Sequence, residues 1–297
     1  MSVRASASAL ARPATGLSIH RALPWAAMAI LFVALFWAPM ANTAKVWWTN
    51  PDAGHGLLLG PLAAFLAWKR GLVAGSRAQP VLGALMLLAA VALRYVSGLA
   101  TELFTMRLSV VGAALGLIVF AWGVRQVLHW WLPVALLVLS VPLPEIVLGA
   151  LALPLQFKAS QMGAALLEWR HVPVQLSGNV INLPGHQLFV TEACSGLRSL
   201  SALLALGLLT GGLFLSTPIG RALLFLIAIP IAILLNGIRV FLTGFFVYFV
   251  DPALGEGLMH YTEGWVMFVA AMAILGGTAW VLSRGEQALA RRKAAAP

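Results

Sequence analysis

Charged residues are scarce in this chain of 297 residues, because Asp, Glu, Lys and Arg make up only 9% of it while hydrophobic residues make up 61%. Such a composition cannot cover a water-facing surface with polar groups, which excludes an ordinary soluble domain. The surroundings of most of this chain must therefore be lipid. The sequence predicts an all-α polytopic membrane protein.

Long apolar runs bounded by charges, Gly or Pro mark the expected membrane crossings. A hydrocarbon core of about 30 Å needs roughly 20 mostly apolar residues for each helical crossing. We expect about eight transmembrane helices on this basis, at approximately 24–41, 55–68, 81–98, 104–122, 127–142, 197–215, 221–249 and 264–282. A transmembrane domain over 24–283 then lies between a cytoplasmic tail at 1–23 and a basic cytoplasmic tail at 284–297.

Basic residues lie at the borders of these runs and predict the topology. They precede the first run and follow the second, fourth, sixth and eighth, as Arg4, Arg12, Arg21, Lys69, Arg70, Arg77, Arg125, Arg221, Arg284, Arg291, Arg292 and Lys293. The positive-inside rule then places both termini in the cytoplasm of a multi-pass inner-membrane protein. The net charge of +10 is therefore a property of membrane borders, and we expect no nucleic-acid partner. A cleaved signal peptide is the alternative reading of the first run, but no small-x-small cleavage site follows Trp37.

Cysteine is almost absent as well, because Cys194 is the only one in the chain. A single thiol excludes an intramolecular disulfide and any site built from several thiolates. His171 and His186 have no third ligand near them in the sequence. We therefore expect neither a metal nor a cofactor.

The connection between the fifth and sixth runs is long, and we expect it to stay outside the cytoplasm over 143–193. Its first half, 146–169, has apolar residues at spacings of three and four, interrupted by Pro154, which is typical of an amphipathic segment lying at the membrane interface. Its second half, 172–190, alternates apolar and polar residues around two turn sequences. This pattern predicts a small extracytoplasmic β-hairpin element. A long connection in a compact membrane protein is a place to expect function.

Cys194 follows this connection directly, in the expected first turn of the sixth run. Backbone N–H groups and the helix dipole at that end favour a thiolate, and Arg198 lies four residues on, which places it on the same helix face. The alternative is that Cys194 is one more small residue that packs at a helix interface.

Two further polar residues are expected at the same depth. Arg239 interrupts the seventh run, where a charge is costly unless it faces protein or water, and a rise of about 1.5 Å per residue from Arg221 places it roughly 27 Å along the helix. His260 opens the eighth run from the same side, and imidazole is the commonest general base for a thiol. Taken singly, Arg239 could extend to the outer headgroups and His260 could belong to an interfacial aromatic belt. Together with Cys194 they predict a membrane-embedded cysteine peptidase or transpeptidase.

The roles in this hypothesis follow from the chemistry of each side chain. Cys194 attacks a peptide carbonyl, His260 takes and returns the proton, and Arg239 stabilises the oxyanion or positions a substrate carboxylate. Arg198 is a second candidate for the electrostatic role, and the sequence does not separate it from Arg239. His55, expected on the same outer side, either contributes to this site or is a satisfied histidine in a turn.

The segments Cys194-Ser-Gly-Leu-Arg198 and Asn236-Gly-Ile-Arg239, followed by His260, resemble the motifs of the exosortase and archaeosortase family of membrane enzymes. The resemblance extends from about residue 24 to 283. It implies a sortase-like cysteine transpeptidase whose partners are exported proteins with a carboxy-terminal sorting tail of the PEP-CTERM type. Such a tail combines a short Pro-Glu-Pro-type motif, a membrane helix and a basic cluster. The resemblance also implies the catalytic set Cys194, Arg239 and His260 at the outer face of the inner membrane.

Two other functions remain open at this point. The first is a non-enzymatic membrane assembly or export factor for surface protein or polysaccharide, in which 143–193 binds a partner and Cys194 only packs. The second is a transporter in which Arg239 and His260 line the path. Transporters of this size often contain repeated halves, and the sequence shows no such repeat.

Overall fold

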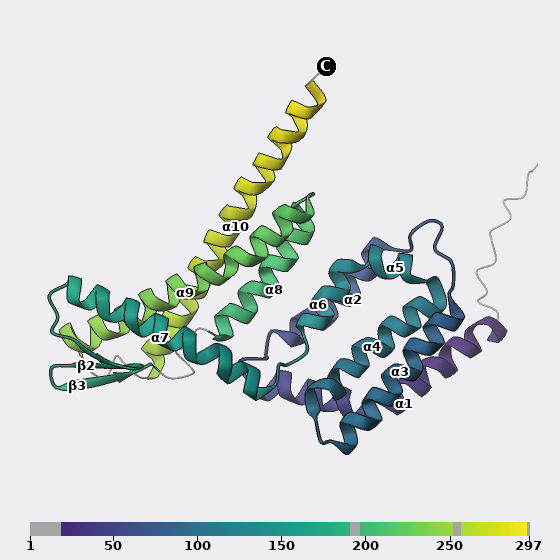
Figure 1. The fold of residues 1–297 in the computed structure, drawn as a ribbon, viewed down its shortest axis with the longest axis horizontal. Helices are drawn as coiled ribbons and strands as arrows, with labels where there is room; N and C mark the ends of the chain where they lie inside the picture. The colour runs from purple at the N-terminus through teal and green to yellow at the C-terminus, as the bar shows by residue number, and fades with distance from the viewer. Residues whose placement is uncertain (1–18, 191–196, 252–256, 296–297) are drawn as a thin grey trace, which may run out of the picture. The chain divides into compact units, whose positions relative to one another are not determined.

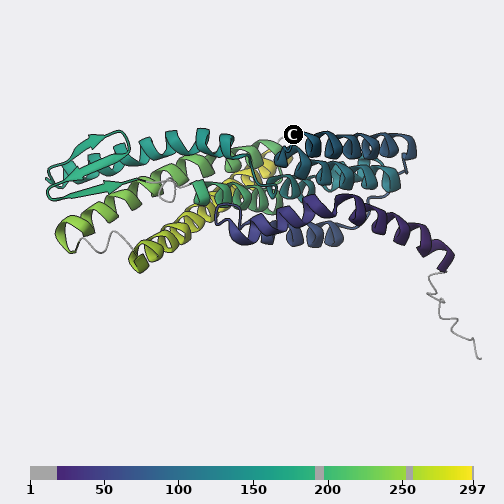
Figure 2. The same cartoon turned by 90° about the horizontal axis from the view of Figure 1, so that it is seen from below.

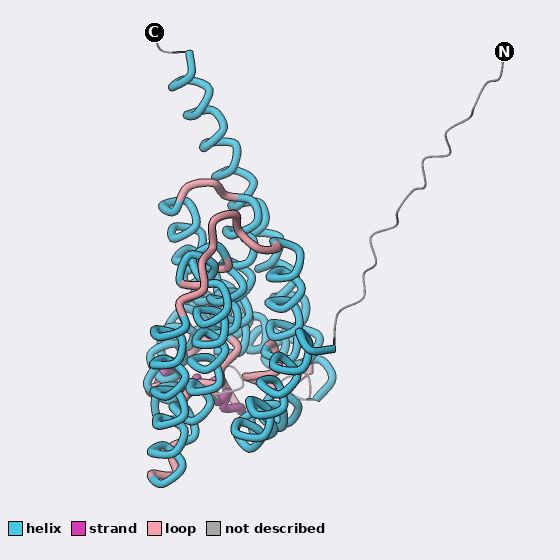
Figure 3. Tube along the Cα trace, turned by 90° about the vertical axis from the view of Figure 1, so that its right-hand side faces the viewer, coloured by secondary structure: helices cyan, strands magenta, loops and turns pink. Residues whose placement is uncertain are grey.

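A computed structural model describes residues 19–190, 197–251 and 257–295, and this part of the chain is mostly helical (Figures 1 and 3). It divides into two units, 1–38 and 39–297, and the boundary falls inside helix α1 (Ile19–Thr49). In the first unit the rings of Phe32 and Phe36 are in contact, with centroids 5.2 Å apart. The elements described below belong to the second unit, except for the part of α1 before residue 39.

Five helices are long and apolar enough to cross a membrane. They are the Trp25–Thr49 part of α1, α3 (Pro80–Leu99), α4 (Leu103–Trp122), α9 (Pro218–Phe249) and the Trp265–Arg292 part of α10 (Gly257–Ala295). Each corresponds to one of the crossings expected from the sequence. The protein is therefore an all-α multi-pass membrane protein.

The other three expected crossings correspond to shorter helices, so the count of eight is not confirmed. Helix α2 (Gly56–Arg70) has 15 residues, which at 1.5 Å per residue gives about 22 Å against a hydrocarbon core of about 30 Å. The fifth run is divided at Trp130 into α5 (Val124–His129) and α6 (Trp131–Leu139). Helix α8 (Leu197–Phe214) is also short.

Helices α3 and α4 form a hairpin that packs closely. A Cβ at Gly83 would lie 2.4 Å from the backbone nitrogen of Phe120, so the two helices approach at a position where only Gly fits. Arg107 of α4 is buried, and its Nε and Nη2 donate to Asn42 Oδ1 at 3.1 and 2.8 Å. This contact ties the last part of α1 to the hairpin and gives a guanidinium in an apolar helix a protein acceptor.

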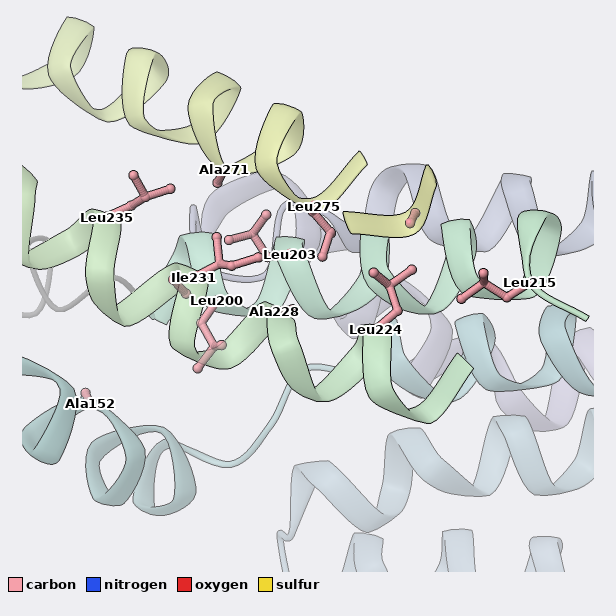
Figure 4. Close-up of a cluster of buried hydrophobic side chains, with 12 residues drawn as sticks. Ala152, Leu200, Leu203, Leu215, Leu224, Ala228, Ile231, Leu235, Ala271 and Leu275 are labelled. Carbon is pink, nitrogen blue, oxygen red and sulfur yellow. The ribbon is translucent and has the colours of Figure 1, made fainter. Parts of the chain in front are cut away.

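A second group of helices consists of α8, α9 and α10, which share the largest buried apolar cluster. Figure 4 shows Leu200 and Leu203 of α8 beside Ile231 of α9, with Leu275 of α10 pointing into the same space. Helix α6 contacts this group through α8, because Leu132 and Leu136 of α6 are buried in one cluster with residues of α2 and with Ala205 of α8.

The long connection folds into a helix and a small sheet. Helix α7 (Glu145–Trp169) continues through Pro154, where the sequence predicted an interruption. Strands β1 (Gln175–Ser177), β2 (Val180–Leu183) and β3 (His186–Phe189) form an antiparallel sheet in the order β1-β2-β3, which lies alongside α7 (Figure 2). The described sheet thus has one strand more than a hairpin. Its position relative to the membrane stays a prediction.

The sheet is anchored on two helices. Ile181 and Leu183 of β2 are buried in a cluster with Leu167 of α7 and Val240 and Val247 of α9. Helices α7 and α9 touch closely in this region, since a Cβ at Gly163 would lie 2.5 Å from Val240 Cγ1. Small residues let the two backbones approach in this way, as is common between membrane helices.

Candidate functional site

The residues predicted for the site are described to different extents. Cys194 lies outside the described residues, because the structure resumes at Leu197. Arg198 lies in the first turn of α8 and His260 in the first turn of α10, and for both only the backbone is described. Arg239 of α9 is fully described and half-buried.

The turn of α9 around Arg239 faces protein. Asn236 and Thr243, one turn before and one turn after it, are 5% and 4% exposed, and the Thr243 hydroxyl donates to the Arg239 carbonyl at 3.0 Å. A Cβ at Gly237 would lie 2.8 Å from Met162 Cβ, so α7 lies directly against this turn. The cost of a charge in an apolar helix predicted such surroundings for Arg239.

Helices α8 and α9 run antiparallel, and their register relates Arg239 to the start of α8. A Cβ at Gly211 would lie 3.4 Å from Arg221 Cα, and one at Gly207 would lie 3.5 Å from Phe225 Cα. Both helices rise by about 1.5 Å per residue. The first turn of α8, 197–200, therefore lies level with 232–235 of α9, one helical turn before Arg239.

Helix α10 is also antiparallel to α9, and a carboxylate fixes its register. Glu286 accepts hydrogen bonds from the backbone N–H groups of Ser216 at 2.7 Å and Thr217 at 3.2 Å, and from the Thr217 hydroxyl. Since Thr217 caps the start of α9, the start of α10 lies level with the C-terminal third of α9. The backbone thus brings the first turns of α8 and α10 to the end of the helix group where Arg239 lies. No side-chain contact among the predicted catalytic residues falls within the described part of the chain.

His55 lies in the turn before α2. The contacts of α2 with α6, and of α6 with α8, place this turn at the same end of the helix group as the first turn of α8. Trp130 Nε1 donates to Gly71 O at 2.9 Å, so the end of α2 meets the start of α6, while Gly212 near the end of α8 packs on Leu132 of α6. Helices α2 and α8 therefore run parallel, with their first residues at one end.

The surroundings of His55 favour a neutral imidazole. Burial lowers its pKa below the ordinary value, and hydrogen bonds to the backbone of Leu139 and Asp52 act in the opposite direction with smaller effect. Next to it, Trp47 Nε1 donates to Ser140 O at 2.8 Å, and the Trp47 ring fills the space beside Gly56. Of the two readings left open by the sequence, this geometry fits a satisfied histidine in a turn.

One polar contact in this region was not expected from the sequence. The Asn179 side chain donates from Nδ2 to Val190 O at 3.0 Å and to Gln156 Oε1 at 3.5 Å. The Val190 N–H in turn donates to Asn179 O at 3.0 Å. Together these bonds fix the last described residue before Cys194 onto β2 and α7. The signal in the sequence is Gln156, a polar residue on the α7 face that packs against α9.

Within the described ranges, no group of three or more His, Cys, Asp or Glu side chains is arranged to hold a metal ion. Among the predicted site residues whose side chains are described, Arg239 offers a guanidinium, and the sheet packed on α7 and α9 precedes Cys194 in the chain.

A comparison with protein families finds a match to the family described as transmembrane exosortase, over residues 47–277. The matched range covers most of the chain and contains Cys194, Arg239 and His260. No curated protein and no solved structure matches the chain.

Proposed function

Because the chain belongs to the transmembrane exosortase family, we propose that it is a cysteine peptidase or transpeptidase that cleaves the carboxy-terminal sorting tails of exported proteins. The observation that carries this proposal is the family match over 47–277, in a chain whose only thiol, Cys194, immediately precedes α8.

The proposed reaction begins at the thiolate of Cys194, which attacks the carbonyl carbon of the scissile peptide bond. His260 takes the thiol proton and gives it to the leaving amine as the C–N bond breaks. The product of this step is a thioester on Cys194, which water or an amine nucleophile then resolves with His260 acting as base. The position of Cys194 before a helix N-terminus favours its anionic form.

Arg239 supplies positive charge where the oxyanion develops or where a substrate carboxylate binds. Two features of α9 support this role: Arg239 lies one helical turn beyond the level at which α8 begins, and its turn is covered by α7 rather than by lipid. Arg198 is the second candidate for the same role, since it lies in the first turn of α8.

We further propose that the site faces outward from the inner membrane, with both termini in the cytoplasm. The distribution of basic residues supports this orientation. A nucleophile at the outer face reaches only bonds just outside the lipid, which fits a tail whose own membrane helix holds it beside the enzyme.

The proposal is tested by Cys194→Ala in cells that express a reporter ending in a Pro-Glu-Pro-type motif, a membrane helix and a basic cluster. We expect the variant to reach the membrane in normal amount and to leave the reporter uncut, because no other thiol is present. Mass analysis of the reporter's C-terminus measures the result and separates hydrolysis from transfer.

The matched control is Thr210→Ala in α8, whose hydroxyl donates only within its own helix, to Leu206 O at 2.7 Å and Gly207 O at 3.3 Å. This variant should process the reporter like the wild type. Undiminished processing by Cys194→Ala would overturn the enzymatic proposal in favour of a non-enzymatic export factor.

A further inference from the structure

We propose that the outer edge of β3 binds an extended segment of the exported protein's tail as an additional antiparallel or parallel strand. This inference rests on the proposed function, because it assigns the place where the substrate of the same site is held. The edge belongs to His186–Phe189, the last strand before Cys194.

The pairing of β2 with β3 shows which backbone groups are free. Leu183 pairs with His186 and Ile181 with Leu188, and the Val190 N–H donates to Asn179 O at 3.0 Å in the same ladder. Antiparallel pairs alternate between hydrogen-bonded and non-hydrogen-bonded positions. His186 and Leu188 therefore form backbone hydrogen bonds with β2. The backbone N–H and C=O groups of Gln187 and Phe189 point away from β2, toward the outer edge of the sheet.

Those outward groups belong to Gln187 and Phe189, and no described backbone pairs with them. Both side chains are exposed, and Phe189 keeps 57% of its surface open. Proteins usually protect a free edge with Lys, Pro, a bulge or a covering element. In the described part of the chain β3 has no Lys, Pro or bulge and no strand paired on this edge, although α9 contacts β3. The outward main-chain groups of the edge can therefore pair with an incoming strand.

The opposite edge of the sheet is less suited to this role. Strand β1 has three residues, and only Leu176 between its two ends directs its backbone groups outward. A peptide beside β3 can pair with the outward backbone groups of two residues, whereas a peptide beside β1 can pair with those of only one.

The sequence connects this edge to the nucleophile. Cys194 is the fifth residue after Phe189, a distance of at most about 18 Å for an extended chain. Strand addition binds a peptide through main-chain bonds and leaves alternate side chains for selectivity, which suits a short extended motif. We therefore assign the edge to the tail segment that precedes the substrate's membrane helix.

The edge is also rigid enough to position a scissile bond. Ile181 is 0% exposed and packs with Leu167 and Val247, and the Asn179 side chain fixes Val190. A strand on such a support is held in one orientation before the substrate arrives, which lowers the entropy lost on binding.

Gln187→Pro tests the edge directly. Proline removes the outward N–H and fills the space beside it, while the bonds of His186 and Leu188 to β2 remain. Gln187→Ala is the matched control for the side chain, and Leu176→Pro is the matched control for the opposite edge.

Each variant is combined with Cys194→Ala in the full-length protein, so that capture of the uncut reporter tail is measured without cleavage. We expect Gln187→Pro to reduce capture about tenfold, the loss that one or two main-chain hydrogen bonds produce. Gln187→Ala and Leu176→Pro should retain capture within about twofold. Thermal unfolding of every variant is measured as well, and we expect Gln187→Pro to melt within a few degrees of Gln187→Ala, so that a loss of capture is separated from misfolding.

A second measurement does not depend on proline. A photo-crosslinking aromatic amino acid at Phe189 should link to the reporter tail, while the same amino acid at Gln175, on the far strand, should not.

Equal capture by Gln187→Pro and Gln187→Ala, without a crosslink at Phe189, would overturn the edge assignment. So would an equal loss in Leu176→Pro, or a crosslink from Phe189 to a second copy of this chain. None of these results touches the proposed function, which fails only if Cys194→Ala still cuts the reporter.

Discussion

At the scale of single residues, buried polar side chains in this protein are satisfied mainly by backbone groups. Gln126 accepts from the Val73 N–H at 2.9 Å and donates to Gly71 O at 3.1 Å, which fixes the loop after α2. Asn179 holds Val190 in a similar way. Neutral partners of this kind avoid the desolvation penalty that a buried ion pair carries.

His55 gives a prediction on pH dependence. Its pKa in the folded protein is lowered by burial, so the folded state resists protonation while the unfolded chain binds a proton near the ordinary pKa of about 6.5. Stability is therefore lost as the pH falls below that value and is retained above it. We expect the melting temperature in detergent to fall between pH 7.5 and 5.5, and His55→Gln to make this fall shallower.

The control for this experiment is His186→Gln, which replaces an exposed imidazole. It should keep the slope of the wild type. A His55→Gln variant whose melting temperature follows pH as steeply as the wild type would contradict the assignment of this dependence to His55.

Sequence reasoning was informative about single residues where one physical cost dominates. The cost of a charge in an apolar helix predicted protein around Arg239, and the structure places Asn236 and Thr243 buried beside it. The bond from Asn179 to Val190 could not be predicted, because it depends on the register of the sheet. The side-chain arrangement of Cys194 and His260 stays a prediction.

At the scale of elements, helix ends follow local chemistry. The Glu102 side chain accepts from the N–H groups of Phe104 at 2.9 Å and Thr105 at 2.7 Å, which starts α4, and Gly123 ends it with a φ of 81°. Such signals can be found in a sequence. Proline was a weaker guide, since α7 continues through Pro154 and α9 through Pro230.

Two glycines of α7 give a matched test of its packing on α9. Gly163→Ala puts a methyl group 2.5 Å from Val240 Cγ1, so the helices must separate, at a cost of about 1 to 3 kcal/mol. Gly149→Ala meets nothing within 4 Å, and the better helix propensity of Ala stabilises it by up to about 1 kcal/mol. Thermal unfolding in detergent should show opposite shifts, and equal shifts would contradict the close α7–α9 contact.

At the scale of the whole molecule, the long helices exceed the thickness of the membrane. Helix α9 has 32 residues and α10 has 39, which correspond to about 48 and 58 Å against a hydrocarbon core of about 30 Å. We expect the part of α9 that packs on α7 and the sheet to extend beyond the hydrocarbon core on one side. We expect the stretch of α10 after Glu286 to extend beyond it on the other side. An apolar run therefore indicates immersion in lipid, but its length alone does not count crossings.

This distribution predicts that the sheet and the end of α10 lie on opposite sides of the membrane. With Cys194→Ala as background, Gln175→Cys on β1 and Gln287→Cys on α10 each introduce a single exposed thiol. A membrane-impermeant maleimide should label Gln175→Cys in intact cells and Gln287→Cys only after permeabilisation. Labelling of both before permeabilisation would contradict a crossing by α10. The reverse order of labelling would place the sheet and the start of α8 on the cytoplasmic side, where an exported tail could not be cut after translocation.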